Sequence, residues 1–410
     1  MNQAINTLDR PFAFASDRPS LNLGPAGVAA GAIVLGTLYL NAAVNWRQAV
    51  LFLVGAAAGI VLYHAAFGFT SSWRVFVADR RGAGLRAQML MLAVTCSIFF
   101  PLLAAGHAFG QPLRGSVSPA GISVIVGAFL FGVGMQLGGG CASGTLYTAG
   151  GGSTRMVMTL LAFIAGSVIG TLHVPWWTAT PALKPISLVT TLGPLAALLI
   201  SLSLFGVLTL ITIAVERRRH GQLAVDSSPR TGWRRLLHGP WPLVAGALGL
   251  ALVNIATLAI SGRPWGVTSA FALWGAKALA AAGVNVASWP YWSTPAQAAA
   301  LKASVVTDVT SVMDVGIMLG ALVAAGMAGR FAPVWRVPPR SLAAAISGGI
   351  LLGYGARIAY GCNIGAYFSG IASGSLHGWL WLVAAFGGSA IGTRLRPLFG
   401  LRVEGRKSHA

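Results

Sequence analysis

The chain has 410 residues, of which 55% are hydrophobic and only 9% are charged. With a mean hydropathy of +0.73, this composition excludes an ordinary soluble domain and predicts an all-α polytopic membrane protein. The formal net charge is +20, but the basic residues fall between apolar segments. We therefore attribute the charge to membrane topology and expect a lipid bilayer, and no nucleic acid, as the partner of this surface.

Apolar segments long enough to cross a bilayer, roughly 20 residues each, recur along the chain. Residues 264–300 are too interrupted for a full crossing, and they predict a half-helix followed by an external amphipathic piece. We expect about ten transmembrane helices, near residues 22–43, 47–67, 87–106, 118–138, 155–174, 193–215, 242–260, 309–328, 341–359 and 377–392.

The basic residues predict the orientation of these helices. If the N-terminus is inside, 21 of the 28 Lys and Arg residues fall in cytoplasmic segments, 6 fall outside, and Arg357 lies at membrane depth. An excess of Lys and Arg is typical of cytoplasmic connections. We therefore expect both termini to be cytoplasmic.

One glycine-rich pattern occurs twice, 221 residues apart. The first copy ends in Gly139-Gly140-Cys141-Ala142-Ser143-Gly144, and the second ends in Tyr360-Gly361-Cys362-Asn363-Ile364-Gly365. Glycines further upstream also coincide in the two copies. In a hydrophobic protein, a duplicated break around a cysteine indicates a transport site built from two related halves. The coinciding upstream pairs are Gly127 with Gly348, Gly132 with Gly353, and Gly134 with Gly355.

A second pattern, Gly68-Phe69-Thr70-Ser71-Ser72-Trp73, recurs as Gly266-Val267-Thr268-Ser269-Ala270-Phe271. The two copies are five spans apart, an odd number, so the halves run in opposite directions across the membrane. The first half then opens its breaks toward the cytoplasm, and the second half opens them outward. We expect an N-terminal segment and first span at 1–44, inverted repeats at 45–192 and 242–395, a linking span with a basic loop at 193–241, and a tail at 396–410.

The breaks hold the candidate binding residues. Glycines let the backbone approach a ligand, and the N–H groups of a helix that restarts after a break favour an anion. Cys141 and Cys362 would stand at these restarts, either as thiolates or as neutral thiols that donate weak S–H hydrogen bonds. The alternative is that the glycines only permit tight helix packing and the cysteines are small buried hydrophobes. No His or acidic residue accompanies either cysteine, so we expect no metal, and an odd number of cysteines argues against disulfides.

Gln136 and Arg357 occupy equivalent positions, five residues before each cysteine. A charge at membrane depth usually faces an interior path or pairs with another group. Arg357 is therefore either an attractor for an anion or the partner of Asp308 or Asp314. The hydroxyls of the other pattern, including Thr70 and Thr268, either bind an oxyanion or cap helix starts. Cys96 lies in an apolar run without the glycine pattern and is predicted to be a core residue.

At these motifs the sequence resembles the YeeE/YedE family of bacterial sulfur-transport membrane proteins, over residues 45–395. The resemblance implies an hourglass-like fold in the bacterial inner membrane, and uptake of thiosulfate or of a related sulfur or selenium species. It also implies that Cys141 and Cys362 handle the terminal sulfur through transient S–H···S contacts. Gly68 departs from the family, whose thiosulfate-transporting members typically have a cysteine there. A small TusA-like sulfur-carrier protein in the cytoplasm is an implied partner.

The sequence predicts a transporter rather than an enzyme, without a cofactor, that imports a small inorganic sulfur anion, most simply thiosulfate. It has no P-loop, dinucleotide fingerprint or HExxH motif. Two other readings stay open: a membrane thiol oxidoreductase or sulfurtransferase, and a membrane subunit that docks a sulfur carrier. The predicted binding residues are Cys141, Cys362, Gly139, Gly140, Gly361, Gly68, Thr70, Gly266, Thr268, Gln136, Arg357 and Asn363.

Overall fold

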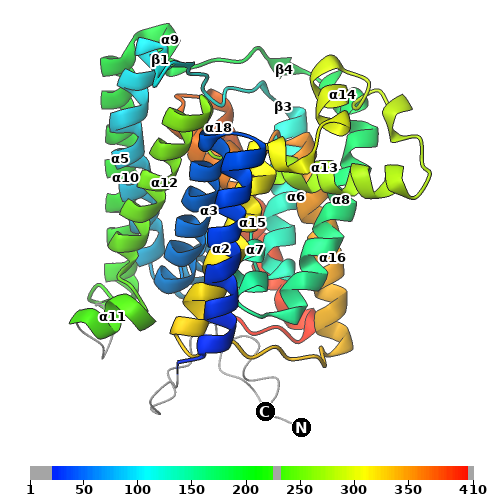
Figure 1. The fold of residues 1–410 in the computed structure, drawn as a ribbon. Coiled ribbons are helices and arrows are strands. Elements are labelled where there is room, and N and C mark those ends of the chain that lie inside the picture. The colour runs from blue at the N-terminus through cyan, green and yellow to red at the C-terminus, as the bar shows by residue number, and fades with distance from the viewer. Residues whose placement is uncertain (1–20, 225–231, 405–410) are drawn as a thin grey trace.

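A computed structural model describes residues 21–224 and 232–404. The sequence predictions for the first twenty residues, for part of the basic loop and for the last residues of the tail lie outside these ranges. The described chain is almost entirely helical, with four two-residue strands (Figure 1). The all-α polytopic prediction is confirmed.

The elements follow one another with short connections. They are α2 (Leu23–Ala43), α3 (Trp46–Ala65), α4 (Phe69–Asp79), α5 (Ala83–Ala105), β1 (His107–Ala108), β2 (Gln111–Pro112), β3 (Ala120–Gly121), α6 (Ile122–Gly138), α7 (Ala142–Gly150), α8 (Thr154–Thr178), β4 (Ala182–Leu183), α9 (Leu188–Leu192), α10 (Pro194–His220), α11 (Gly232–His238), α12 (Leu243–Ser261), α13 (Thr268–Ala281), η1 (Val286–Ser288), α14 (Pro295–Lys302), η2 (Val305–Thr307), α15 (Val309–Met327), α16 (Pro339–Ile358), η3 (Asn363–Phe368), α17 (Ser369–Ala372), α18 (Leu376–Leu395) and η4 (Arg396–Phe399).

Within the described ranges, nine helical stretches are long and apolar enough to cross a membrane. They match the first nine predicted spans, and three of them contain a break: 46–79, 122–150 and 339–372. The tenth predicted span, 377–392, forms α18, which is helical but is not one of the nine. Residues 264–300 contain the short helix α13 and the beginning of α14.

The helices stand roughly side by side, and their ends form two faces (Figure 1). One face, at the bottom of Figure 1, holds α11, the start of α2 and the end of α10. We call it the basic face because it carries Arg217, Arg218 and Arg219 in the last turn of α10 and Arg80 at the neighbouring end of α4. The opposite face, at the top, holds α9, α14 and the small strands, which pair as β1 with β2 and β3 with β4.

The helix pairs follow a reciprocal pattern. α3 packs against α15 and α5 against α12, while α8 packs against α16 and α6 against α18. At the centre α6 crosses α16 so closely that a Cβ on Gly348 would lie 2.2 Å from the backbone nitrogen of Gly138. A Cβ on Gly355 would similarly lie 2.5 Å from the carbonyl oxygen of Gly127. The glycines inside the predicted motifs therefore serve close helix packing, which is one of the two roles expected for them.

Candidate functional site

The first break separates α6 from α7. Gly139 ends α6 in a left-handed conformation with φ of 92°, and Cys141 is the N-cap residue of α7. The Cys141 sulfur accepts the backbone N–H of Gly144 at 3.4 Å and lies 3.5 Å from the Ser143 hydroxyl oxygen. The side chain is almost completely buried. Cys141 therefore stands at the helix restart that the sequence predicts, held by two local contacts.

The second break separates α16 from the π-helix η3. Tyr360 and Gly361 have positive φ angles of 57° and 147°, and Cys362 is the N-cap residue of η3. The Cys362 side chain makes no capping hydrogen bond to the start of η3. Cys362 is fully buried. The two cysteines thus occupy equivalent positions, but only the Cys141 sulfur accepts a capping hydrogen bond.

The glycine before each cysteine has a structural reason. A Cβ on Gly140 would lie 3.0 Å from the backbone nitrogen of Thr145, and one on Gly361 would lie 2.9 Å from that of Ala366. Any larger residue would press on the first turn of the following helix. The φ of Gly361 is also one that side chains rarely adopt. These two glycines let the chain fold back tightly enough to begin a new helix at the cysteine.

Gln136 and Arg357 make the same kind of contact in the two halves. Gln136 Nε2 donates to the carbonyl oxygen of Thr70 at 3.0 Å, and Arg357 Nη2 donates to that of Thr268 at 3.0 Å. The sequence pairs Thr70 with Thr268, so each break is tied to the other break of its own half. Arg357 Nη1 also donates to the Tyr291 hydroxyl at 2.8 Å.

Neither aspartate considered as a partner of Arg357 forms that pair. Asp308 caps α15 by accepting the Ser311 N–H and lies 3.8 Å from Arg263. Asp314 is fully buried, and both of its carboxylate oxygens lack a hydrogen-bond partner within the described residues. Arg357 is therefore held by a carbonyl and a tyrosine, and its charge is not neutralised by either acid.

Basic and aromatic side chains bind the carbonyl groups left free where α6 and α16 end. Arg155 donates to the carbonyls of Leu137 and Gly138, each at 2.7 Å, and Arg396 donates to that of Gln136 at 2.7 Å. In the other half, a ring nitrogen of His377 lies 2.9 Å from the Ala359 carbonyl oxygen. These residues hold the breaks in place. Their role is not visible in the sequence, where Arg155 and Arg396 count only among the 21 basic residues expected in cytoplasmic segments.

A cavity lies at the basic face between the two breaks of the first half. It measures about 250 Å³, and Gly68, Gly140 and Cys141 share its wall. Three arginines also line it, and Arg74 among them is paired with Glu404 at 2.8 Å. The guanidinium groups of the other two make the cavity suitable for an anion. Its lining includes Gly68, Thr70, Ser71, Gly139, Gly140, Cys141 and the arginines Arg74, Arg155 and Arg396.

A second cavity, of about 330 Å³, lies at the opposite face. Its wall includes Lys184 and Ser123 and reaches Tyr360, two residues before Cys362. The Ser123 hydroxyl donates to the carbonyl oxygen of Ile358, the last residue of α16. Each Gly-Cys break thus borders a cavity, and the two cavities belong to different faces of the molecule.

Buried aromatic rings fill the core around the breaks. Phe131 lies between Phe163 and Trp381, with ring centroids 6.2 Å and 5.4 Å away. Trp73 packs at 6.5 Å from Trp381 on α18, and Phe271, its counterpart in the sequence pattern, packs at 4.9 Å from Phe163 on α8. We call these rings the aromatic layer, and they come from five helices, α4, α6, α8, α13 and α18.

The remaining predicted binding residues lie in or next to the same breaks in the helices. Thr70 and Thr268 sit in the first turns of α4 and α13, and neither acts as a side-chain cap. The Thr70 hydroxyl and both amide atoms of Asn363 are buried without a hydrogen-bond partner in the described chain. Gly266 has no atom within 4 Å of a Cβ position. Buried polar groups without partners carry a free-energy cost, so these atoms are candidates for contact with a polar ligand.

The third cysteine, Cys96, does not belong to either Gly-Cys break. Cys96 is fully buried, and its sulfur makes one weak contact, 3.9 Å from the carbonyl oxygen of Ile371. All three cysteines are free. Within the described ranges no group of three or more His, Cys, Asp or Glu side chains could hold a metal ion.

Comparison with known proteins gives a consistent assignment. The Sulphur transport family matches residues 64–391. "Probable transporter YedE" of Escherichia coli is 34% identical over 175 residues, which is 42% of this chain and 42% of YedE. "Thiosulfate transporter TsuA" of Spirochaeta thermophila is 26% identical over 337 residues, 80% of this chain and 92% of TsuA. The Escherichia coli TsuA is 25% identical over 351 residues, 81% of this chain and 89% of TsuA.

The family match covers both Gly-Cys breaks and the helices that hold them. It agrees with the nine apolar helical stretches and with the resemblance drawn from the motifs. The chain therefore belongs to the Sulphur transport family of membrane proteins.

Proposed function

We propose that the protein imports a small sulfur-containing anion, thiosulfate in the first instance, across the bacterial inner membrane. The anion would enter the cavity of the opposite face, pass the aromatic layer beside Cys362 and Cys141, and leave through the cavity of the basic face. Two inverted halves, 45–192 and 242–395, would supply one break pair each. The observation that carries this proposal is that the two cysteine breaks border cavities of different faces.

The reciprocal packing supports the two-half arrangement. Helices α3, α5, α6 and α8 find their partners in α15, α12, α18 and α16, which is the pattern expected from two copies related by a two-fold axis in the membrane plane. The paired contacts of Gln136 and Arg357 with Thr70 and Thr268 follow the same relation. Under the positive-inside rule, the basic face is cytoplasmic.

The chemistry at the cysteines suits a sulfur anion. A neutral thiol is a weak S–H donor, and the N–H groups at the starts of α7 and η3 add partial positive charge. Arg357 would draw the anion into the second half, and Asn363 would supply amide N–H groups beside Cys362. Weak donors at successive positions let an anion bind and leave again, which transport requires.

Uptake of sulfur-labelled thiosulfate into proteoliposomes tests the proposal. We expect Cys141→Ala and Cys362→Ala each to lower uptake about tenfold or more, which corresponds to about 1.4 kcal/mol of lost stabilisation. Cys96→Ala is the matched control, because it removes a buried cysteine that lies outside both Gly-Cys breaks, and it should retain wild-type uptake. Full uptake by both test variants, at normal insertion and thermal stability, would refute the proposed path.

The other readings predict different outcomes of the same preparation. A sulfurtransferase or oxidoreductase would form a persulfide or mixed disulfide on Cys141 or Cys362 during turnover, visible in the mass of the intact protein. A docking subunit would bind a TusA-like sulfur carrier at the basic face without any flux. A selenium-containing or other sulfur anion would compete with labelled thiosulfate, or replace it, in wild-type vesicles.

A further inference from the structure

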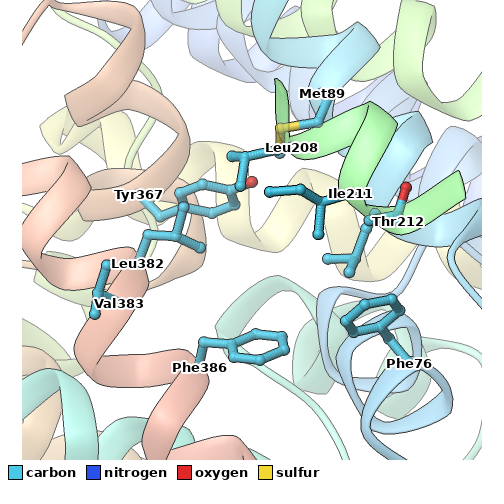
Figure 2. A pocket seen from close by; sticks show the side chains of 10 residues that line it. Phe76, Met89, Leu208, Ile211, Thr212, Tyr367, Leu382, Val383 and Phe386 are labelled. Carbon is cyan, nitrogen blue, oxygen red and sulfur yellow. The ribbon is translucent and has the colours of Figure 1, made fainter. Parts of the chain in front are cut away.

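An apolar groove opens on the side of the molecule, away from both cavities. It measures about 280 Å³ and lies between α4, α5, α10, η3 and α18. In Figure 2, Met89, Leu208 and Ile211 form one wall, and Leu382, Val383 and Phe386 face them across the gap. The full lining is Phe76, Leu85, Met89, Leu208, Ile211, Thr212, Tyr367, Leu382, Val383 and Phe386.

The groove lies at membrane depth. Its lining includes residues of α5 and α10, two of the helical stretches that are apolar enough to span a bilayer. Val383 is 71% exposed and Ile211 is 50% exposed, so the groove faces the surroundings rather than the protein core. The hydrocarbon layer of a bilayer is about 30 Å thick. The exposed side of a groove between spanning helices therefore faces lipid acyl chains.

Two exposed arginines lie beyond the end of the groove that is nearer to the basic face. Arg218 lies seven residues after Ile211 and Arg219 lies eleven residues after Leu208, so both continue the groove-lining stripe of α10. Seven residues of helix rise about 10 Å. Neither arginine forms an ion pair within residues 21–224 and 232–404. The groove thus runs from an apolar interior to a cationic rim.

The neighbouring acid does not cancel this rim. Glu216 is fully buried and already engages Arg81 at 3.3 Å and Arg86 at 2.7 Å. It also accepts the backbone N–H of Gly82 at 3.0 Å. Because Glu216 is satisfied by these partners, the exposed arginines that follow it remain available to an anion from outside the protein.

The corresponding surface of the other half is covered by protein. Helix α13, the counterpart of α4, is covered by the segment 286–302, from which Trp292 packs in with 1% exposure. Trp292 Nε1 donates to the Thr171 hydroxyl of α8 at 3.2 Å. No such segment follows α4, since α5 begins four residues after α4 ends. One half fills this position with its own side chains, and the other leaves it to the bilayer.

We propose that this groove is a binding site for an anionic phospholipid, whose acyl chain lies along Leu208, Leu382 and Phe386 and whose phosphate pairs with Arg218 and Arg219. The pairing is electrostatic, so zwitterionic lipids, whose headgroups carry no net charge, bind the same groove less tightly. The proposal concerns the lipid face alone and does not depend on the transported substrate.

The lipid would also contact the second break. Tyr367 lines the groove and lies in η3, five residues after Cys362. Its ring stacks on Trp381 with centroids 6.4 Å apart and planes 9° apart. A bound acyl chain therefore packs against the side chain that connects η3 to the aromatic layer, and it stabilises that arrangement.

Native mass spectrometry of the full-length protein, released from nanodiscs of equal phosphatidylglycerol and phosphatidylcholine, tests the site. Wild-type protein should retain one phosphatidylglycerol in preference to phosphatidylcholine by about tenfold. Leu382→Trp, which fills the groove, should lose this lipid. The double variant Arg218→Gln with Arg219→Gln should keep a lipid but lose the preference for phosphatidylglycerol.

Val315→Trp is the matched control. Val315 lines another apolar pocket, of about 180 Å³, between α2, α3 and α15, and this variant should retain the lipid as wild type does. Unchanged lipid retention by Leu382→Trp, or equal retention of both lipids by wild type, would overturn the proposal. A dimer mass that disappears in Leu382→Trp would also overturn it, because a second copy of the chain would then be the occupant. Thermal unfolding in detergent checks that each variant is folded.

Discussion

The two Gly-Cys breaks share a backbone plan but differ in how their sulfur atoms are engaged. At the first break, protein groups already approach the Cys141 sulfur, from Gly144 and Ser143. At the second, the Cys362 sulfur has no side-chain cap bond, and the Asn363 amide beside it has no partner in the described chain. The difference suggests that a duplicated scaffold can hold two unequal sites, with polar capacity left for a ligand mainly at the second.

The two halves also differ in whether an arginine is paired with an acid. Arg74, in the cavity of the basic face, is neutralised by Glu404 at 2.8 Å. Arg357 is held by a carbonyl and by Tyr291, whose ring lies 5.4 Å below the guanidinium. We infer that the second half keeps its positive charge available on the side from which an anion would arrive.

The crossing of α6 and α16 gives the largest expected effect. A Cβ on Gly348 would lie 2.2 Å from the backbone nitrogen of Gly138, whereas a Cβ on Gly127, its counterpart, would meet a side-chain carbon of Ile358 at 2.6 Å and its nearest backbone atom, the Gly355 oxygen, at 2.8 Å. Side chains can move aside and backbone cannot. We expect Gly348→Ala to lower the free energy of unfolding by about 2–3 kcal/mol, and Gly127→Ala to lower it by less, as measured by thermal unfolding in detergent.

Gly206→Ala is the control for both substitutions. Gly206 lies on α10 with no atom within 4 Å of its Cβ position, so alanine should leave stability unchanged or raise it slightly. If Gly348→Ala and Gly206→Ala have equal effects, the close crossing at the centre of the fold is wrong.

Replacing Arg357 with glutamine makes the two halves alike. Glutamine at this position can still donate to the Thr268 carbonyl, as Gln136 does to that of Thr70, but it carries no charge. We expect Arg357→Gln to raise the thiosulfate concentration for half-maximal uptake about tenfold, the effect of about 1.4 kcal/mol, and to reduce its dependence on ionic strength. The measurement is the concentration dependence of uptake at two salt concentrations.

Arg47→Gln provides the comparison for charge alone. Arg47 donates to the Phe109 carbonyl at the opposite face, whereas Arg357 donates to Tyr291 and to the Thr268 carbonyl. An equal rise in the half-maximal concentration for Arg47→Gln and Arg357→Gln would mean that net surface charge, and not the position of Arg357, attracts the anion.

The helices could be predicted from the sequence because each one is determined by the apolar residues of its own segment. A long apolar run must form a helix in a bilayer, so spans such as 155–174 and 193–215 reappear as α8 and α10. The positions of Cys141 and Cys362 at helix starts followed from the glycines beside them in the same way. What the halves share could be predicted from repetition alone.

The partners across the fold could not be predicted, because they depend on how distant helices pack. Arg155 binds carbonyls 17 and 18 residues away, and Arg357 binds Tyr291, which lies in a segment that showed no repeat in the sequence. Charge bias identified Arg155 as a topology marker, and nothing in its neighbourhood indicated a capping role. The aromatic layer was also missed, since its rings come from five different helices and have no common spacing.

The contact between Arg74 and Glu404 gives the smallest expected effect and a pH dependence. Burial raises the pKa of Glu404, but the hydrogen bonds from Arg74 outweigh it and hold that pKa below its usual range. A carboxylate with a depressed pKa stabilises the folded state above its unfolded pKa, and this stabilisation is lost as the pH falls through the folded pKa. The exposed fraction of Glu404 is 36%, so we expect only about 0.5–1 kcal/mol. Thermal unfolding should show Glu404→Gln below wild type at pH 7, with the difference shrinking as the pH falls below about 4. A difference that persists at low pH would mean that Glu404 acts through packing and that Arg74 is not neutralised by it, which would remove the charge contrast between the two halves.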